Sequence, residues 1–415
     1  MSFATGLRCR ECGATYPDDA RYSCDECFGP LEVTYDLAAA RGSVTRASIE
    51  SGPRSIWRYH DLLPDAGDDP VDLGAGWTPL RRADRLAARL GVRELWLKDD
   101  TRNPTGSFKD RVVATALSSA RQLGFTTAAC ASTGNLATSV AAHAAAIGWP
   151  SVTIIPHDLE RAKVAMSAIF GGTVLAVEGN YDDVNRLCVE LVDEHPDWAF
   201  VNVNLRPYYA EGSKTLAFEI VEQLGWRLPA QVVVPVASGS QFTKVAKGFE
   251  QLRALDLVTG PAPRMFAAQA AGCSPVAAAF ARGDEVVIPQ RPATIARSLA
   301  IGNPADGPYV LDELRRGGGD AGAVSDAAIL DGIAELAETE GIFAETAGGV
   351  TVATLHQLIE RGTLDPASSI VAIISGHGLK TLDAIADRAG VFATVPPSLA
   401  AAEAALAGDR LVVTR

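Results

Sequence analysis

One lysine of this chain stands where a reactive amine is expected. Residues 103–111 read Asn-Pro-Thr-Gly-Ser-Phe-Lys-Asp-Arg, in which Ser107 is a natural helix N-cap and Asp110 can complete a capping box. Lys109 then falls in a first helical turn, where the partial positive charge of the N-terminus opposes an ammonium group and lowers its pKa. A lowered pKa suits an amine that attacks a carbonyl carbon. Taken alone, however, the segment fits a solvated lysine on an ordinary helix start better.

Three polar turns give Lys109 a chemical context, since each lies between an expected strand and an expected helix. The first, Ser132, Thr133, Gly134 and Asn135, offers hydroxyls and backbone N–H groups to a carboxylate. The second offers N–H groups, two hydroxyls and an amide to a phosphate, and comprises Ala237, Ser238, Gly239, Ser240 and Gln241. The third begins with Ser375, whose hydroxyl suits a ring nitrogen. Each alone could be an ordinary loop, but together with Lys109 they predict a phosphorylated cofactor held at its aldehyde, phosphate and ring nitrogen.

Four of the seven cysteines form two C-x-x-C pairs close together near the N-terminus: Cys9 with Cys12, and Cys24 with Cys27. Such spacing lets four thiolates converge tetrahedrally on zinc. Because all four ligands would be cysteine, no position is left for a catalytic water, and we expect a structural zinc ion. The alternative is a ribbon that keeps its fold with its sites empty.

Composition narrows the class of protein. The chain has 415 residues, 47% of them hydrophobic, and a net charge of −13, which argues against nucleic-acid and membrane-surface partners. The N-terminal residues lack the apolar segment of a secretory signal, and no apolar run approaches the roughly 20 residues that span a bilayer. We therefore expect a cytoplasmic enzyme that acts on a small molecule.

The elements that must position these residues alternate between strand and helix. Short apolar runs bounded by turn residues predict strands at 93–98, 127–131, 151–155, 173–177, 232–236, 264–269 and 370–374. Helical periodicity predicts helices from Lys109 to about Gly124, and at 136–147, 159–170 and 242–255. Near-continuous apolar strands are typical of buried parallel sheets. The pattern indicates an α/β protein with open, doubly wound sheets, whose ligands bind beyond the carboxyl ends of the strands.

These motifs resemble the pyridoxal-phosphate enzymes of fold type II and, within them, the threonine synthases. The resemblance rests on segments 103–111, 132–135, 177–183, 211–219, 294–304, 345–349 and 375–380. A four-cysteine ribbon also occurs in a subset of that family. The resemblance implies a tryptophan synthase β-like fold with two open, doubly wound domains after a zinc-ribbon-like segment. We expect the ribbon at 1–36, a large cofactor-binding domain at 37–111 and 206–415, and a small domain at 112–205.

The resemblance also implies a reaction, the conversion of O-phospho-L-homoserine and water to L-threonine and phosphate. Lys109 would form the Schiff base with pyridoxal phosphate and then move protons, and Phe108 would pack beside the cofactor. Asn135 would bind the cofactor O3′, residues 237–241 its phosphate and Ser375 its ring nitrogen. Ser132 and Thr133 would bind the substrate carboxylate. Candidates for the substrate phosphate are Asn180, Arg186, Asn204 and Arg206, because arginine pairs with phosphate in bidentate fashion.

Other readings stay open at this point. A serine/threonine dehydratase would use the same lysine with a simpler pocket, and a cysteate synthase would add sulfite within a similar framework. A zinc-ribbon binding module fused to a catalytically inactive domain is a third alternative. The phosphate loop is poorer in glycine and asparagine than that of many threonine synthases, and Ser375 stands where threonine is common. We expect a homodimer.

Overall fold

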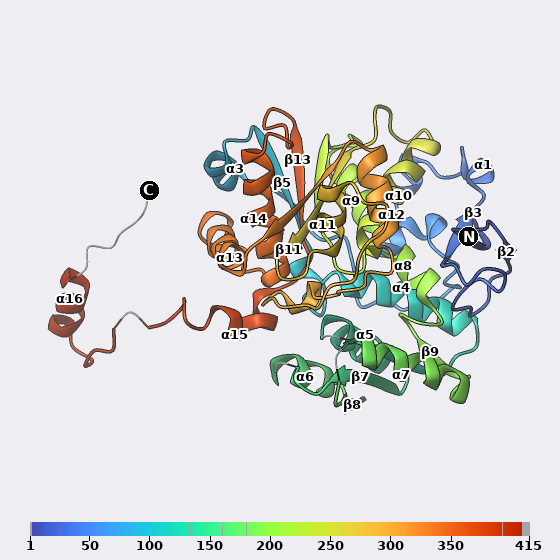
Figure 1. The fold of residues 1–415 in the computed structure, drawn as a ribbon, viewed down its shortest axis with the longest axis horizontal. Helices are drawn as coiled ribbons and strands as arrows, with labels where there is room; N and C mark the ends of the chain where they lie inside the picture. Colours follow the sequence, from blue (N-terminus) through green and yellow to red (C-terminus); the bar gives the residue numbers. More distant parts are fainter. Residues whose placement is uncertain (1, 133, 160, 180, 392, 409–415) are drawn as a thin grey trace.

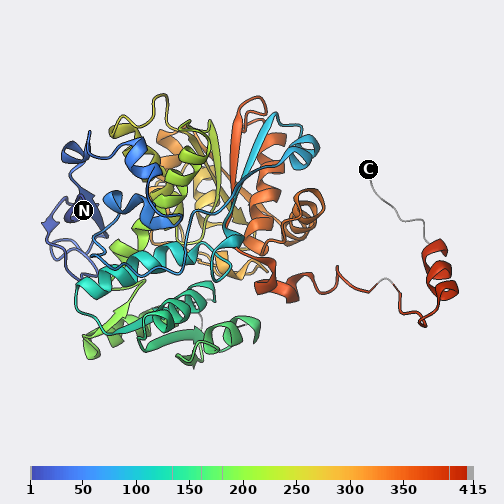
Figure 2. The same cartoon turned by 180° about the vertical axis from the view of Figure 1, so that it is seen from behind.

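Three β-sheets organise the chain (Figure 1). The computed structural model describes residues 2–132, 134–159, 161–179, 181–391 and 393–408. Within these ranges, no helix combines the length and the apolarity that crossing a membrane requires. A C-terminal helix, α16 (Leu399–Gly408), lies apart from the rest of the molecule in both views (Figures 1 and 2).

The largest sheet has six strands in the order β12-β11-β10-β13-β5-β4. They are β4 (Leu80–Arg82), β5 (Glu94–Asp99), β10 (Gln231–Pro235), β11 (Arg264–Ala270), β12 (Asp320–Val324) and β13 (Ser369–Ile374). All neighbours are parallel except β4 and β5. Four of these strands were predicted within a residue or so at each end; the short edge strand β4 and the Ala- and Gly-containing β12 were not.

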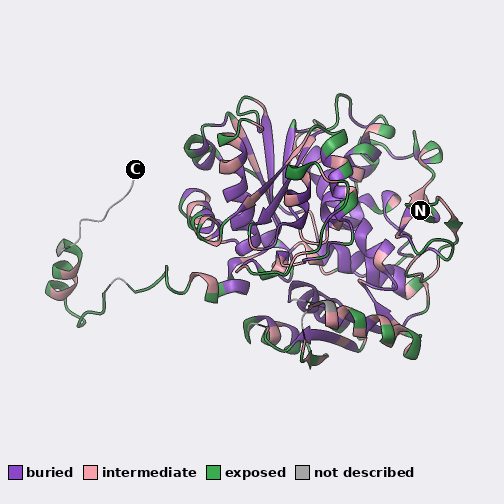
Figure 3. Cartoon of the chain, in the orientation of Figure 1, coloured by how far each residue is buried: buried purple, intermediate pink, exposed green. Residues whose placement is uncertain are grey.

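Helices cover both faces of this sheet. Val232 and Val234 of β10 face the core under α9 (Lys214–Gln223), α10 (Ser240–Ala254), α11 (Pro275–Arg282) and α12 (Gly307–Arg316). Val233, between them, faces the opposite core under α3 (Asp84–Leu90), α13 (Asp326–Glu340) and α14 (Thr346–Glu360). Successive side chains of a strand point to opposite faces, so a strand buried on both sides is apolar throughout; β10 and β13 are buried along their whole length, and most of the sheet is coloured as buried in Figure 3. The doubly wound prediction is confirmed.

A second, parallel sheet has the order β8-β7-β6-β9. Its strands are β6 (Thr127–Ala131), β7 (Ser151–Pro156), β8 (Thr173–Val177) and β9 (Trp198–Phe200), and its helices are α5 (Asn135–Ala146), α6 (Arg161–Ala168) and α7 (Tyr181–Glu194). The sequence analysis missed only the three-residue β9 among these strands. Two helices, α4 (Lys109–Gln122) and α8 (Arg206–Glu211), join this unit to the larger sheet.

The N-terminal ribbon is a three-stranded antiparallel sheet of β1 (Ala4–Cys9), β2 (Thr15–Tyr16) and β3 (Leu31–Tyr35). Its Leu7 and Val33 are buried in a cluster with Val112 of α4 and Tyr208 of α8. The ribbon therefore packs directly on the two joining helices. The predicted division into 1–36, 37–111 with 206–415, and 112–205 stays a prediction.

Short elements complete the chain. They are α1 (Leu37–Ala40), α2 (Arg46–Glu50), α15 (Leu382–Ile385) and the 3-10 helices η1 (Ile56–Leu62), η2 (Asp100–Arg102), η3 (Arg297–Leu299) and η4 (Gly378–Thr381).

Candidate active site

A cavity of about 210 Å³ lies where the carboxyl ends of β6, β10 and β13 meet. The predicted residues that line it are Phe108, Lys109, Ser132, Asn135, Arg206, Ala237, Ser238, Gly239, Ser240, Gln241 and Ser375. The three turns singled out in the sequence thus border one space, as expected for strands that end at the same edge of parallel sheets.

The first turn of α4 is capped differently from the prediction. Phe108 is the N-cap and its side chain makes no capping hydrogen bond. The carboxylate of Asp110 accepts hydrogen bonds from the backbone N–H and the hydroxyl of Thr105, both at 2.7 Å. The hydroxyl of Ser107 is buried and has no partner among the residues described. The predicted Ser107 cap is wrong, because Asp110 is engaged by the preceding loop instead of by the helix start.

Lys109, the first residue of α4, points its amine into the cavity. Its Nζ donates a hydrogen bond to the hydroxyl of Tyr209 at 2.8 Å and lies 4.5 Å from the centre of the Phe108 ring. Desolvation of the amino group lowers the pKa of Lys109 to about 8, although the charge of Glu345 acts in the opposite direction. The direction agrees with the sequence analysis, but burial is the main cause, where the helix N-terminus had been expected.

Asn135 begins α5 and faces α14 across the cavity. Its side-chain Nδ2 donates to both carboxylate oxygens of Glu345, at 3.0 and 2.9 Å. The hydroxyl of Ser132 accepts from the backbone N–H of Gly134 and of Ala137, both at 2.9 Å, and so caps the same helix. The Oδ1 of Asn135 is buried and unpartnered in the part of the chain that the structure covers, so it is available to a ligand.

The loop after β10 forms a cradle at the N-terminus of α10. Gly239 adopts φ +95°, and a Cβ there would meet Val310 and Asp306 at 2.8 and 2.9 Å, so a larger residue would not fit. The loop carbonyl of Ser238 accepts the backbone N–H of Asp306 at 2.8 Å. Free N–H groups at a helix N-terminus are suited to bind a phosphate.

Ser375 follows β13 and lies beside the lysine segment. It is only 3% exposed, and its carbonyl accepts the backbone N–H of Phe108 at 2.9 Å. The hydroxyl of Ser375 and the amine of Lys109 therefore border the same cavity.

Comparisons with known proteins bear on this arrangement. Residues 71–376 match the family of pyridoxal-phosphate dependent enzymes. The threonine synthase of Methanocaldococcus jannaschii is 38% identical over 381 residues, which cover 91% of this chain and 93% of that protein. The threonine synthase of Methanosarcina acetivorans is 36% identical over 92% of this chain and 93% of that protein. The chain belongs to the threonine synthase family.

Solved structures agree on the fold. Diaminopropionate ammonia lyase from Escherichia coli superimposes with a TM-score of 0.64 at 20% identity, covering 93% of this chain and 97% of that one. The processed form of threonine deaminase isoform 2 from Solanum lycopersicum gives a TM-score of 0.62 at 20% identity, covering 86% of each chain. The tryptophan synthase β-like, fold type II architecture expected from the sequence is confirmed.

The cavity fits the cofactor of the threonine synthase family. Among the described residues, three buried polar atoms that belong to lining residues have no partner: Asn135 Oδ1, Gln241 Nε2 and Ser298 Oγ. Buried polar groups are normally hydrogen-bonded, so these unpartnered atoms indicate that a polar ligand binds in the cavity. Together with the amine of Lys109 and the cradle at Gly239, they match a phosphorylated aldehyde.

The residues predicted to bind substrate separate into groups. Ser132 and Arg206 line the cavity. Arg186 does not: its side chain is 71% exposed and pairs with Asp183 at 3.2 Å. Asn204 is buried and is not among the residues that line the cavity; its Nδ2 donates to the backbone carbonyl of Trp198 at 3.1 Å. Thr133 and Asn180 lie outside the described residues.

Several lining residues were not predicted as site residues. They include Tyr181, Asn185, Asn202, Tyr209, Ser298, Asn303 and Glu345. Segments quoted for the family resemblance contain some of them, since Ser298 and Asn303 lie in 294–304 and Glu345 begins 345–349. Asn202 lies in none of the segments on which the family resemblance rests, so the sequence did not indicate it as a site residue. Its amide exchanges hydrogen bonds with the backbone of Ala131, at 3.2 and 3.1 Å, and only the paired strands bring it to the cavity.

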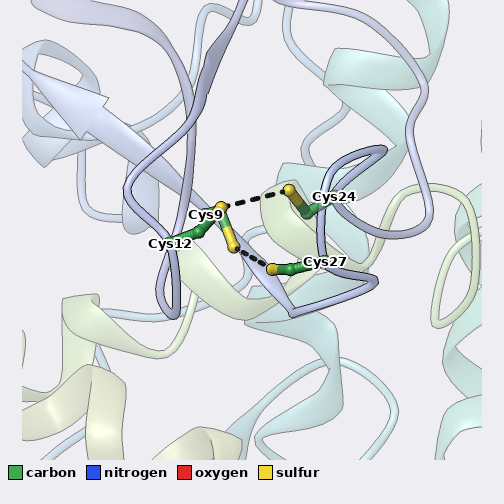
Figure 4. Close-up of side chains that lie close together, drawn as sticks. All are labelled: Cys9, Cys12, Cys24 and Cys27. Atoms are coloured by element: carbon green, nitrogen blue, oxygen red, sulfur yellow. Dashed lines mark hydrogen bonds between the residues drawn. The ribbon is translucent and has the colours of Figure 1, made fainter.

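The four N-terminal cysteines converge as predicted (Figure 4). Their sulfur atoms all lie within 4.8 Å of one another, with Cys9 and Cys27, and Cys12 and Cys24, each 3.5 Å apart. Four thiolates at such spacing could hold a tetrahedral metal ion. Cys130, Cys188 and Cys273 are buried in the core, as expected.

Proposed function

We propose that this protein converts O-phospho-L-homoserine and water into L-threonine and phosphate. The observation that carries the proposal is that Lys109, the cradle at Gly239 and Arg206 line the same cavity. A substrate with an amine at one end and a phosphate at the other needs a reactive lysine and an anion site apart from that of the cofactor phosphate. Membership in the threonine synthase family supports the same assignment.

Pyridoxal phosphate, when bound through its aldehyde, supplies the electron sink that weakens bonds at the α and β carbons of an amino acid. We propose that Lys109 would hold it through its aldehyde, that residues 237–241 would hold its phosphate and that the Ser375 hydroxyl would face its ring nitrogen. Asn135 would contact the ring oxygen, and Phe108 would pack beside the ring.

Lys109 is the proposed acid and base. The Nζ of Lys109 lies in the cavity, where it would be within reach of the substrate carbons. A pKa of about 8 leaves the amine poised to take protons from Cα and then Cβ, so that phosphate can leave from Cγ, and to return protons to Cγ and, after water has added, to Cα. The 2.8 Å hydrogen bond to Tyr209 fixes the direction in which the amine points. Water then adds at Cβ.

Arg206 is the cationic residue that we propose for the substrate phosphate. It lines the cavity and lies on α8, across from Ser132 at the start of α5. Ser132 is placed to donate to the substrate carboxylate, because its oxygen already accepts two backbone N–H groups and its own proton has no acceptor among the residues that the structure describes. Thr133, Asn180, Arg186 and Asn204 remain predictions for this site.

Other features complete the proposal. A structural zinc ion at Cys9, Cys12, Cys24 and Cys27 is supported by the convergence of the sulfur atoms. A cytoplasmic location and a homodimeric assembly remain predictions from the sequence.

The decisive experiment supplies the purified, cofactor-loaded protein with O-phospho-L-homoserine and measures threonine and inorganic phosphate. We expect equal amounts of both, and neither from the Lys109→Ala variant. Parallel reactions contain L-serine, L-threonine, or O-phosphoserine with sulfite. Keto acids from serine or threonine, or cysteate from O-phosphoserine, without threonine from the first substrate, would overturn the proposal.

A further inference from the structure

Helix α8, which carries Arg206, forms hydrogen bonds to the N-terminal ribbon. Tyr208 of α8 donates through its hydroxyl to the backbone carbonyl of Asp19 at 2.9 Å. Glu211, at the end of α8, accepts from the hydroxyl of Tyr35 on β3 at 2.9 Å. One face of this short helix therefore contacts the ribbon, while Arg206 lines the cavity. The position of Arg206 depends on contacts made by residues distant in sequence.

A carboxylate links Arg206 to an arginine of the ribbon itself. Asp306 lies between the two: its Oδ2 is 2.8 Å from Arg206 Nη2 and its Oδ1 is 3.5 Å from Arg10 Nη1. The side chain of Asp306 is 9% exposed, against 26% for Arg206 and 18% for Arg10. Such a partly buried pair is screened less than a surface ion pair.

The backbone of Arg10 is part of the first C-x-x-C turn of the ribbon, between Cys9 and Cys12, and is held there by a hydrogen bond. The backbone N–H of Arg10 donates to the carbonyl of Pro30 at 3.0 Å. Its guanidinium lies 3.5 Å above the centre of the Tyr309 ring, on α12. Arg10 therefore reaches Asp306 from a backbone that the folded ribbon holds in place.

The alternation of positive and negative side chains, Arg10 next to Asp306 next to Arg206, affects how strongly this site attracts an anion. Arg206 and Asp306 alone would form a neutral pair, and an arginine neutralised in this way attracts a phosphate weakly. With Arg10 present, one carboxylate is shared by two guanidinium groups, and these three side chains together carry a net charge of +1. Arg10 faces the second carboxylate oxygen, so Arg206 binds Asp306 through Nη2 and Oδ2, and within the described residues its other side-chain N–H groups stay available to a ligand.

We infer that Arg10, although part of the four-cysteine ribbon, is a positioning residue of the active site that acts through Asp306 on Arg206. By its charge and its fixed place it would keep Arg206 oriented and offset the negative charge of Asp306, so that Arg206 attracts the phosphate of the substrate. The inference rests on the proposed function in assigning a phosphorylated substrate to this cavity. It makes the ribbon part of the substrate site.

The test compares cofactor-loaded variants. Arg10→Met is expected to raise the KM for O-phospho-L-homoserine and the calorimetric Kd for inorganic phosphate about three- to tenfold, with kcat nearly unchanged. Arg10→Lys, which keeps the positive charge, should raise the KM and the Kd for phosphate less than Arg10→Met does. The double variant Arg10→Met with Asp306→Asn should bind phosphate more tightly than Arg10→Met alone, because it restores a net charge of +1.

Arg8→Met is the matched control, since Arg8 is an exposed arginine of β1, two residues before Arg10, and it should behave as the wild type. An Arg10→Met protein that binds phosphate normally, or a double variant with a further loss, would overturn the inference. The inference would also be overturned if Arg206→Met bound phosphate as tightly as the wild type does. Failure of the proposed function is distinct: the wild type would then release no threonine, whatever its affinity for phosphate. Arg10→Lys keeps the test decisive if the methionine variant does not fold.

Discussion

The side chain of Asn135 holds that of Glu345 through two hydrogen bonds, at 3.0 and 2.9 Å, although 210 positions separate them in sequence. Asn135 begins α5, on the four-stranded sheet, and Glu345 precedes α14, which packs on the six-stranded sheet. The pair therefore ties the two sheets together at the cavity. It also places a carboxylate, 1% exposed, close enough to Lys109 to act on its pKa.

Replacing Glu345 by glutamine should lower the pKa of Lys109 further. The carboxylate favours the charged amine, so its removal leaves desolvation less opposed. Titration of the lysine in the cofactor-free protein, followed by its rate of reaction with an amine-specific reagent, should then show a midpoint below that of the wild type. Glu338→Gln, at a surface ion pair with Arg89, is the control. An unchanged or higher midpoint in Glu345→Gln would contradict the assignment.

Recombination of the cofactor-free protein with pyridoxal phosphate should depend on pH in a defined way. Only the neutral amine attacks an aldehyde, and the neutral fraction of Lys109 rises as the pH passes about 8. We expect the recombination rate to rise to a plateau with a midpoint near pH 8. A rate still rising steeply toward 10.5, the ordinary value for a lysine, would show that the amine is not desolvated.

Tyr209→Phe should slow turnover without removing the cofactor. The variant loses the hydrogen bond from Lys109 Nζ, and such a bond contributes about 0.5–1.5 kcal/mol when both groups are neutral and about 1.5–3 kcal/mol when one is charged. We expect kcat to fall several-fold while the visible absorbance of the bound cofactor persists. Burial raises the pKa of Tyr209, so its hydroxyl stays protonated between pH 7 and 9. A wild-type kcat would show that the contact is not used in catalysis.

Arg111→Met should destabilise the fold more than the site. Arg111 is fully buried, and its guanidinium contacts the carboxylates of Asp100 and Glu219. Burial alone would raise the pKa of Glu219, but Arg111 and Lys98 lower it to about 2. Removing one member of a buried ionic cluster costs about 3–5 kcal/mol, measurable as the free energy of unfolding in urea. Arg82→Met, at an exposed pair with Asp84, should cost little.

Metal binding should depend on the four ribbon cysteines alone. Purified protein is expected to contain zinc, and Cys24→Ser should lose it, because Cys24 is one of the four converging thiols. Cys188→Ala removes a buried cysteine outside the cluster and should retain the metal. Zinc is measured by atomic emission. If Cys24→Ser and Cys188→Ala contained the same amount of zinc, the four ribbon cysteines would not be its binding site.

Local sequence was sufficient for much of this molecule. The alternation of apolar runs and turns predicted most strands of both parallel sheets, because a strand buried on two faces must be apolar throughout. The spacing of Cys9, Cys12, Cys24 and Cys27 predicted their convergence, since short knuckles fix where their thiols point. The turn after each strand predicted which loops would face a ligand, because parallel strands end at a common edge.

What the sequence left undecided depends on contacts between distant segments. Ser107 had the right type for a helix cap, yet the loop at Thr105 engages Asp110 instead. Arg186 and Arg206 were equal candidates for the substrate phosphate, and only folding places Arg206 in the cavity and leaves Arg186 at the surface. Local propensity and residue type thus determined the elements and the chemistry available to them. The packing of the ribbon, α8 and the two sheets decided which of those groups meet, because a side chain's neighbours are set by the tertiary fold.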